Sequence, residues 1–185
     1  MNSPVRLLGI CGSLRKASLN RALLREIAAM LPPNVTMEID DKLGELPLFN
    51  SDIKDDPAIV AAFKAQISAC DGVIFACPEY NYSVTGALKN GLDWASRPPA
   101  TSPMRSKPCG IIGGAAGMSG SMRAQAHLRQ MLIYSDSPTL NQPEILIARQ
   151  HERFDAAGQL TDESTRELLR KFATAMVAHV VRHAG

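Results

Sequence analysis

The sequence predicts an α/β fold, with a parallel sheet of five strands in the order 2-1-3-4-5 and helices on both faces. Short apolar runs alternate along the chain with segments whose apolar residues recur at helical spacing, a pattern typical of parallel sheets. Residues 73–77 are apolar throughout, as expected of a central strand buried on both faces. The 185 residues contain no repeat, low-complexity tract or linker, so we expect a single domain spanning residues 1–185.

The expected strands are bounded by turn signals. They lie at residues 5–10, 35–39, 73–77 and 109–112, with a fifth region over 138–147 that Pro143 interrupts. The strand at 35–39 is expected at an edge of the sheet, because its apolar and polar residues alternate. The loop over 40–53 is longer than a plain connection, which suggests that it covers a site or contacts a partner subunit.

The expected helices are defined by their first and last residues. The first begins after Ser18 and ends before the prolines at 32–33. Asp56 is expected to cap the second helix, with a proline following in its first turn. A third helix ends at Pro98, and a fourth covers residues 121–134. Thr161 is expected to cap the last helix, with Asp162 in its first turn.

Composition and charge exclude several classes of protein. Hydrophobic residues make up 45% and charged residues 21% of the chain, which is ordinary for a globular protein. A formal net charge of +2 argues against a nucleic-acid or membrane partner. No apolar run approaches the ~20 residues that cross a bilayer. The N-terminus lacks the pattern of a signal peptide, so we expect a cytoplasmic protein.

Cysteine, histidine and serine patterns point to no metal site and no hydrolase. None of the four cysteines forms a Cys-x-x-Cys pair, and no histidine lies at ligand spacing from them. We therefore expect no metal, and buried structural thiols in place of a disulfide framework. Residues 117–121 only superficially match the nucleophile elbow of hydrolases, because Ser121 stands where glycine is required.

The loop after the first strand has the chemistry of a phosphate site. Gly12 permits a sharp turn, Ser13 and Ser18 supply hydroxyls, and Arg15 supplies a planar cation that suits a phosphate. The following helix adds roughly half a positive charge at its N-terminus. The loop is neither a P-loop nor Gly-x-Gly-x-x-Gly, which favours a terminal phosphate, as in FMN, over a pyrophosphate. An ordinary capped turn is the alternative.

Two further loops are expected at the same edge of the sheet. In the order 2-1-3-4-5, the loops after strands 1, 3 and 4 converge beside the point where the strand order reverses. The loop over 78–83 offers exposed amides, and Tyr80 and Tyr82 can form the wall of a site for a flat ring. The loop over 113–120 is nearly free of side chains, so its backbone can approach a ligand closely.

These motifs resemble those of the flavodoxin-like NADPH-dependent FMN reductase family, in particular its quinone and chromate reductase branch. The resemblance covers nearly the whole chain and is carried by residues 12–20, 78–83, 86–90 and 127–130. It implies non-covalent FMN as cofactor, with NADPH or NADH as co-substrate. The flavin-contacting residues that it implies are Ser13, Arg15, Ser18, Leu19 and Asn20 at the phosphate end, Pro78, Glu79, Tyr80 and Asn81 at the ring, and Ala115 where the branch often has serine.

The resemblance also implies a reaction and a quaternary structure. Hydride would pass from NAD(P)H through FMN to a small-molecule acceptor such as a quinone, free flavin, chromate or an azo compound. The flavin supplies the chemistry, so no catalytic side chain is expected. Homodimers or homotetramers are typical, with Arg123 and Glu144 matching residues that link dimers, and Ala126 where a tyrosine is usual. The alternative is a flavodoxin-like electron carrier that has no reductase activity of its own.

Overall fold

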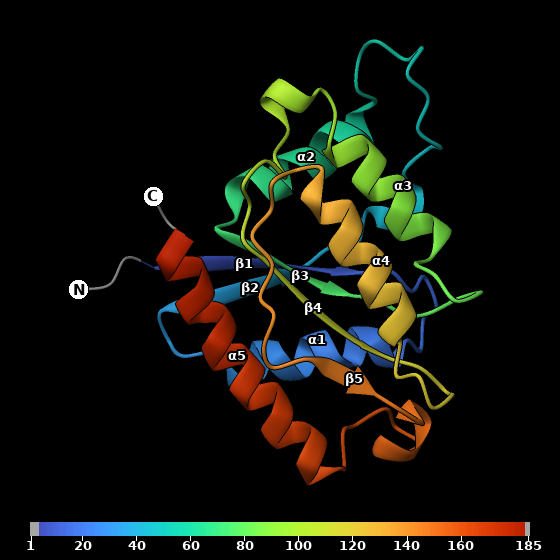
Figure 1. Ribbon diagram of the computed structural model, residues 1–185, viewed down its shortest axis with the longest axis vertical. Helices are drawn as coiled ribbons and strands as arrows, with labels where there is room; N and C mark the ends of the chain where they lie inside the picture. Colours follow the sequence, from blue (N-terminus) through green and yellow to red (C-terminus); the bar gives the residue numbers. More distant parts are fainter. Residues whose placement is uncertain (1–3, 184–185) are drawn as a thin grey trace.

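The five-stranded parallel sheet runs through the centre of the molecule in the order β2-β1-β3-β4-β5, as predicted (Figure 1). The structure is a computed structural model, and it describes residues 4–183. The buried central strand of the prediction is β3, which lies between β1 and β4. The strands are β1 (Val5–Cys11), β2 (Val35–Ile39), β3 (Gly72–Ala76), β4 (Cys109–Gly114) and β5 (Ile145–Ile147).

Helices cover both faces of the sheet and divide its core into two layers. The first layer holds α1 (Leu19–Met30) and α5 (Glu163–His183), which pack on each other and on the sheet. The second holds α2 (Ala58–Ala69), α3 (Gly86–Ala95) and α4 (Met122–Ile133). Short 3₁₀ helices η1 (Leu43–Glu45), η2 (Pro99–Thr101) and η3 (Gln150–Arg153) lie in the connections.

Strand pairing aligns the carboxyl ends of the central strands. Cys11 pairs with Ala76, Ala76 with Ile112, and Gly114 with Ile147. The loops that leave β1, β3, β4 and β5 therefore emerge at one edge, on the right in Figure 1. This edge carries the functional site.

The last helix packs directly on the backbone of two central strands. A Cβ added at Gly72 would lie 2.5 Å from Cγ2 of Val180, and one at Gly110 would lie 2.7 Å from Cζ of Phe172. Both glycines therefore allow α5 to approach the sheet more closely than any larger residue would. Both α5 side chains are almost fully buried.

The long loop before α2 is anchored to α3 at its base and projects from the molecule beyond that point (Figure 1). The indole Nε1 of Trp94 donates to the carbonyl of Pro47 at 2.7 Å, and the backbone N–H of Phe49 donates to Asn90 Oδ1 at 2.8 Å. The two aromatic rings pack edge to face, 5.1 Å apart. Leu48, held between these anchors, is 83% exposed.

Two helix caps differ from the prediction. The helix α2 begins at Ala58, so Asp56 lies outside the capping position, and its carboxylate bonds instead to Nζ of Lys64 at 2.7 Å. The last helix is capped by Asp162 in place of Thr161. Its Oδ1 accepts from the N–H of Thr165 at 2.8 Å, as an N-cap side chain does.

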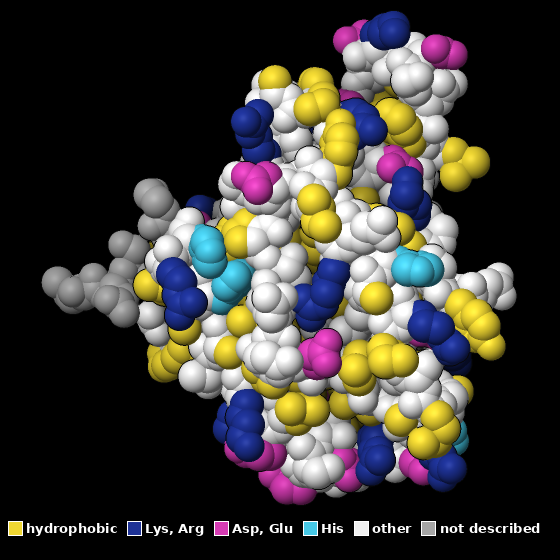
Figure 2. Space-filling model, viewed as in Figure 1, with side chains coloured by type: hydrophobic (Ala, Val, Ile, Leu, Met, Phe, Trp, Pro, Cys, Tyr) yellow, Lys and Arg dark blue, Asp and Glu magenta, His cyan; other side chains and the backbone are white. Residues whose placement is uncertain are grey.

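Charged side chains and cysteines are distributed in different ways over the molecule. Figure 2 shows acidic and basic side chains interspersed over the visible face, with no field of a single sign. Within residues 4–183, no helix combines the length and the apolar character needed to cross a bilayer. All four cysteines are buried, as expected of structural thiols.

Candidate cofactor-binding site

A cavity of about 300 Å³ lies at the carboxyl edge of the sheet, beside the point where the strand order reverses. Its volume is at the lower end of the range for small-molecule sites, roughly 300–1,000 Å³. Residues from four separate strand-to-helix connections meet there. The lining residues are Ser13, Arg15, Ser18, Leu19, Asn20, Pro78, Glu79, Tyr80, Gly114, Ala115, Ala116, Gln150 and His151.

The loop between β1 and α1 leaves its own hydrogen-bond donors free. Ser18 caps α1 by accepting from the N–H of Arg21 at 3.3 Å, as it would in the ordinary capped turn that is the alternative for this loop. The backbone N–H groups of residues 13–17 donate to no backbone group within the described chain. The Arg15 side chain is exposed and lines the cavity. Free N–H groups, a helix N-terminus and a guanidinium together form a site for an anion.

Asn20 ties this loop to the end of β4. Its Nδ2 donates to the carbonyl of Gly114, and its Oδ1 accepts from the N–H of the same residue, both at 3.0 Å. The side chain is 6% exposed. Asn20 therefore fixes the distance between two walls of the cavity.

The loop after β3 is a tight hairpin. Tyr80 and Ser83 exchange both backbone hydrogen bonds at 3.0 Å, and the two residues between them have positive φ, 50° for Asn81 and 65° for Tyr82. Two successive left-handed residues are the geometry of a type I′ turn, which usually contains glycine. The hairpin thus adopts a strained backbone that its surroundings have to hold.

A buried carboxylate holds the hairpin against α4. Glu79 is 5% exposed at its side chain and accepts from Arg123 Nε at 2.7 Å and from Ser119 Oγ at 3.2 Å. It also accepts from the backbone N–H groups of Arg123, at 3.0 Å, and Ala124, at 3.3 Å. Burial alone raises the pKa of Glu79, but these hydrogen bonds outweigh burial and lower it below its ordinary value.

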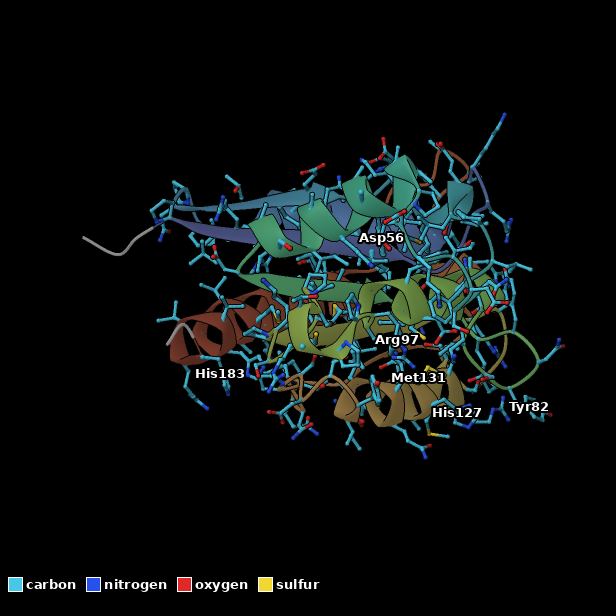
Figure 3. The ribbon with its side chains drawn as sticks, turned by 90° about the horizontal axis from the view of Figure 1, so that it is seen from above. Asp56, Tyr82, Arg97, His127, Met131 and His183 are labelled. Carbon is cyan, nitrogen blue, oxygen red and sulfur yellow. The ribbon has the colours of Figure 1, made fainter. Side chains whose placement is uncertain are left out.

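Arg123 and one further α4 side chain, His127, contact the rest of the hairpin. The Arg123 guanidinium lies over the Tyr82 ring, 3.7 Å from its centroid, and Nδ1 of His127 is 2.9 Å from Oγ of Ser83. Figure 3 shows Tyr82 and His127 close together at one end of the molecule. The Tyr82 ring remains 67% exposed, so one of its faces is open to a ligand or a second protein.

The loop after β4 is held by the end of β5. The N–H of Ala115 donates to the carbonyl of Ile147 at 3.1 Å, and its carbonyl accepts from the N–H of Gln150 at 3.0 Å. The Gln150 side chain lines the cavity and is 4% exposed. Because Ala115 has no polar side chain, only its backbone can bind a ligand there.

Cys77 lies next to the hairpin but is not a nucleophile. Burial, reinforced by the nearby Glu79 carboxylate, raises the pKa of this thiol to about 12. A thiol with such a pKa stays protonated at neutral pH. It therefore serves as a small buried side chain of the hydrophobic core.

All the residues expected at the flavin, apart from Asn81, line one cavity. Asn81 lies at the turn of the hairpin, and its role stays a prediction. The roles of the others also stay predictions, although the structure brings them together. Gln150 and His151 were missed, because they follow the short strand β5 and belong to none of the three motif loops.

The sheet order and the cavity at its carboxyl edge define a flavodoxin-like α/β protein. The model of one family, described as NADPH-dependent FMN reductase, matches residues 5–152. The chain belongs to this family. Membership confirms the resemblance seen in the sequence, and with it an NAD(P)H-dependent oxidoreductase that uses FMN.

Known relatives span the whole chain. It is 44% identical to an NAD(P)H-dependent FMN reductase of Pseudomonas aeruginosa, over 100% of both chains. It is 40% identical to a 2-hydroxy-1,4-benzoquinone reductase of a Burkholderia species, over 95% of this chain and 96% of the relative. It also matches the solved structure of FerB, a flavoenzyme NAD(P)H:(acceptor) oxidoreductase from Paracoccus denitrificans. That match has a TM-score of 0.88 and 33% identity, and covers 97% and 98% of the two chains.

Proposed function

We propose that this protein binds FMN non-covalently in the cavity and uses it to reduce quinones at the expense of NAD(P)H. The observation that carries the proposal is that Ser13 and Arg15, which line the cavity at the N-terminus of α1, have backbone N–H groups without backbone partners. Such a set of donors fits a dianionic phosphate monoester. The names of relatives that reduce quinones support the choice of acceptor.

The phosphate would be held by the β1–α1 loop. Ser13 and Ser18 line the cavity with their hydroxyls, and Arg15 provides a charge-assisted hydrogen bond. Leu19 and Asn20 lie in the first turn of α1, where backbone N–H groups point out of the helix. The Asn20 side chain is already engaged with Gly114, so its contribution is to hold the loop in position.

The flavin ring would be held by the hairpin and by the loop after β4. Pro78 and Tyr80 line the cavity, and Ala115 contributes backbone alone. Both oxygens of the Glu79 carboxylate already accept hydrogen bonds from within the protein. This residue would therefore hold the hairpin in position and would not contact the flavin ring. Asn81 would contact the flavin only through its backbone at the turn.

When bound, FMN supplies the chemistry of accepting hydride from NAD(P)H and passing electrons to an acceptor. The protein binds the phosphate, positions the ring and leaves one side of the hairpin open. No side chain in the cavity is required as a general acid. A half-exposed Tyr80 and an exposed Tyr82 provide flat apolar surface for a planar acceptor such as a quinone. Chromate, azo compounds and free flavin are further candidate acceptors.

An anaerobic titration tests the proposal. The purified protein, loaded with FMN, is expected to show a flavin absorption spectrum that bleaches on addition of NADPH and returns on addition of a benzoquinone. Slow or absent bleaching would favour the electron-carrier alternative. Initial rates with quinones, chromate and an azo dye under identical conditions would then rank the acceptors.

We also infer that the protein is cytoplasmic. We further infer that it self-associates through α4. Met122 and Ile133 are 54% and 76% exposed, and because they are eleven residues apart they lie on the same face of the helix. Arg123, which the family resemblance implies at a dimer contact, bonds to Glu79 of its own chain. Light scattering after size-exclusion chromatography would test this: Ile133→Lys is expected to shift an oligomer toward monomer, and Lys54→Glu on the projecting loop is the control.

A further inference from the structure

One residue that lines the cavity carries a buried donor atom with no partner among the described residues. Among the described residues, only two buried side-chain polar atoms lack a hydrogen bond, Nε2 of Gln150 and Oε1 of Gln66. Gln66 belongs to α2, and its Nε2 bonds to Glu38 at 2.5 Å, away from the cavity. Gln150 lines the cavity and is 96% buried, since 4% of it is exposed.

The position of the Gln150 side chain is fixed by its neighbours. Its backbone N–H donates to the carbonyl of Ala115 at 3.0 Å, which anchors the residue to the loop after β4. Its side-chain atoms Cγ, Cδ and Nε2 lie against Gly114, within 2.6–2.9 Å of where a Cβ would be. The Gln150 amide therefore cannot rotate toward another hydrogen-bond acceptor without losing its contact with Gly114.

The orientation of the Gln150 amide is fixed by a chain of hydrogen bonds. Gly114 binds both ends of the Asn20 amide, and this determines which end of Asn20 is Nδ2. The same Nδ2 lies 3.4 Å from Oε1 of Gln150. If the Gln150 amide were flipped, its Nε2 would face Nδ2 of Asn20, and both atoms are donors. Oε1 therefore faces Asn20, and Nε2 faces away from it.

A buried amide donor without an acceptor is costly to a folded protein, and most such groups in native structures are paired. We propose that Gln150 is a flavin-binding residue whose Nε2 donates a hydrogen bond to an acceptor atom of the bound flavin nucleotide. This inference rests on the proposed function, because it takes FMN as the occupant of the cavity. Gln150 would then form part of the flavin site from the segment after β5, in addition to the three loops that the sequence motifs identify.

Substitution by methionine tests the proposal, because it removes the amide while keeping the length and volume of the side chain. The full chain is stripped of flavin and titrated with FMN, with flavin fluorescence as the readout. Gln150→Met is expected to raise the dissociation constant for FMN by 5–10-fold. It is also expected to leave the thermal midpoint of the flavin-free protein unchanged or higher, because an unpaired buried donor has been removed. A purely structural glutamine would give the opposite result, a lower midpoint with unchanged FMN affinity.

A matched control comes from Gln66, whose amide has one atom without a partner, Oε1. Gln66→Met makes the same chemical change away from the cavity, and it is expected to leave the dissociation constant for FMN within twofold of the wild-type value. If Gln66→Met weakened FMN binding as much as Gln150→Met does, the effect would be non-specific and the proposal would be overturned.

A second variant keeps the test valid if methionine disturbs the fold. Gln150→Glu retains an oxygen that can accept from Asn20 but has no donor at neutral pH. It is expected to raise the dissociation constant for FMN more than Gln150→Met, since the carboxylate also repels the flavin phosphate. Unchanged FMN affinity in either folded variant would overturn the inference about Gln150. Failure of the wild-type protein to bind FMN at all would instead overturn the proposed function.

Discussion

The two main loops of the cavity are stabilised in opposite ways. The β1–α1 loop, residues 12–18, is anchored at Gly12, whose carbonyl accepts from Thr85, and it keeps the N–H groups of residues 13–17 free of backbone partners. The hairpin over 78–83 is held by Glu79 and by contacts from Arg123 and His127. The difference supports our proposal that the first loop binds the ligand, whereas contacts within the protein already hold the second. Changes in the first should therefore affect binding, and changes in the second should affect folding.

Removing the buried carboxylate of the hairpin is expected to have the largest effect on folding. Glu79→Ala leaves Arg123 and two backbone donors of α4 without their acceptor, and we expect a loss of about 2–3 kcal/mol in the free energy of unfolding. Urea unfolding of the flavin-free protein measures this. Glu45→Ala, at an exposed carboxylate, is the control and should change stability by less than about 0.5 kcal/mol. A similar loss in both variants would remove Glu79 as the anchor.

Removing the cation of the first loop should affect binding alone. Arg15→Ala is expected to raise the dissociation constant for FMN by roughly 10–100-fold, the equivalent of a hydrogen bond to a charged group. The stability of the flavin-free protein should stay unchanged, because the Arg15 side chain is exposed. Riboflavin, which lacks the phosphate, provides the control ligand. An equal loss of affinity for riboflavin would show that Arg15 does not bind the phosphate.

Acid should loosen the hairpin before it affects the phosphate loop. The pKa of Glu79 is lowered in the folded protein, so its ionised form stabilises the fold above the ordinary value of 4.5. This contribution is lost as the pH falls below that value toward the lowered pKa. We expect the stability difference between the wild type and Glu79→Gln to shrink over that range in urea titrations at stepped pH. A difference that does not change with pH would mean that the ionised form of Glu79 is not what stabilises the hairpin.

The smallest effect on the free energy of unfolding is expected at the contact between His127 and Ser83 of the hairpin. The hydrogen bond between His127 and Ser83 is exposed, so His127→Ala should cost less than about 1 kcal/mol. A double-mutant cycle with Ser83→Ala isolates the coupling between the two side chains. Zero coupling would mean that Glu79 and Arg123 hold the hairpin without help from His127.

The order of the sheet and the meeting of three loops could be predicted because both depend on local patterns. Alternating strands and helices determine the sheet order, and that order determines which loops meet. The anchoring of the hairpin could not be predicted in this way. Glu79 and Arg123 are 44 residues apart, and only the packing of α4 brings them together.

The missed features have the same physical origin. Gln150 follows a strand of three residues that Pro143 partly obscures in the sequence, and its role depends on Asn20, which is 130 residues away. Similarly, Thr161 and Asp162 are both good helix caps, and the sequence cannot choose between them. The choice depends on Arg153, whose carbonyl binds the Thr161 hydroxyl at 3.2 Å.

The close packing of α5 on Gly72 and Gly110 has a consequence for biosynthesis. The helix is the last element of the chain, yet it covers one face of strands that are made much earlier. While the ribosome is still translating residues 163–183, that face of the nascent sheet has only α1 to cover it. Until α5 has been made and has packed on the sheet, an apolar strip of β3 and β4 is therefore open to chaperones.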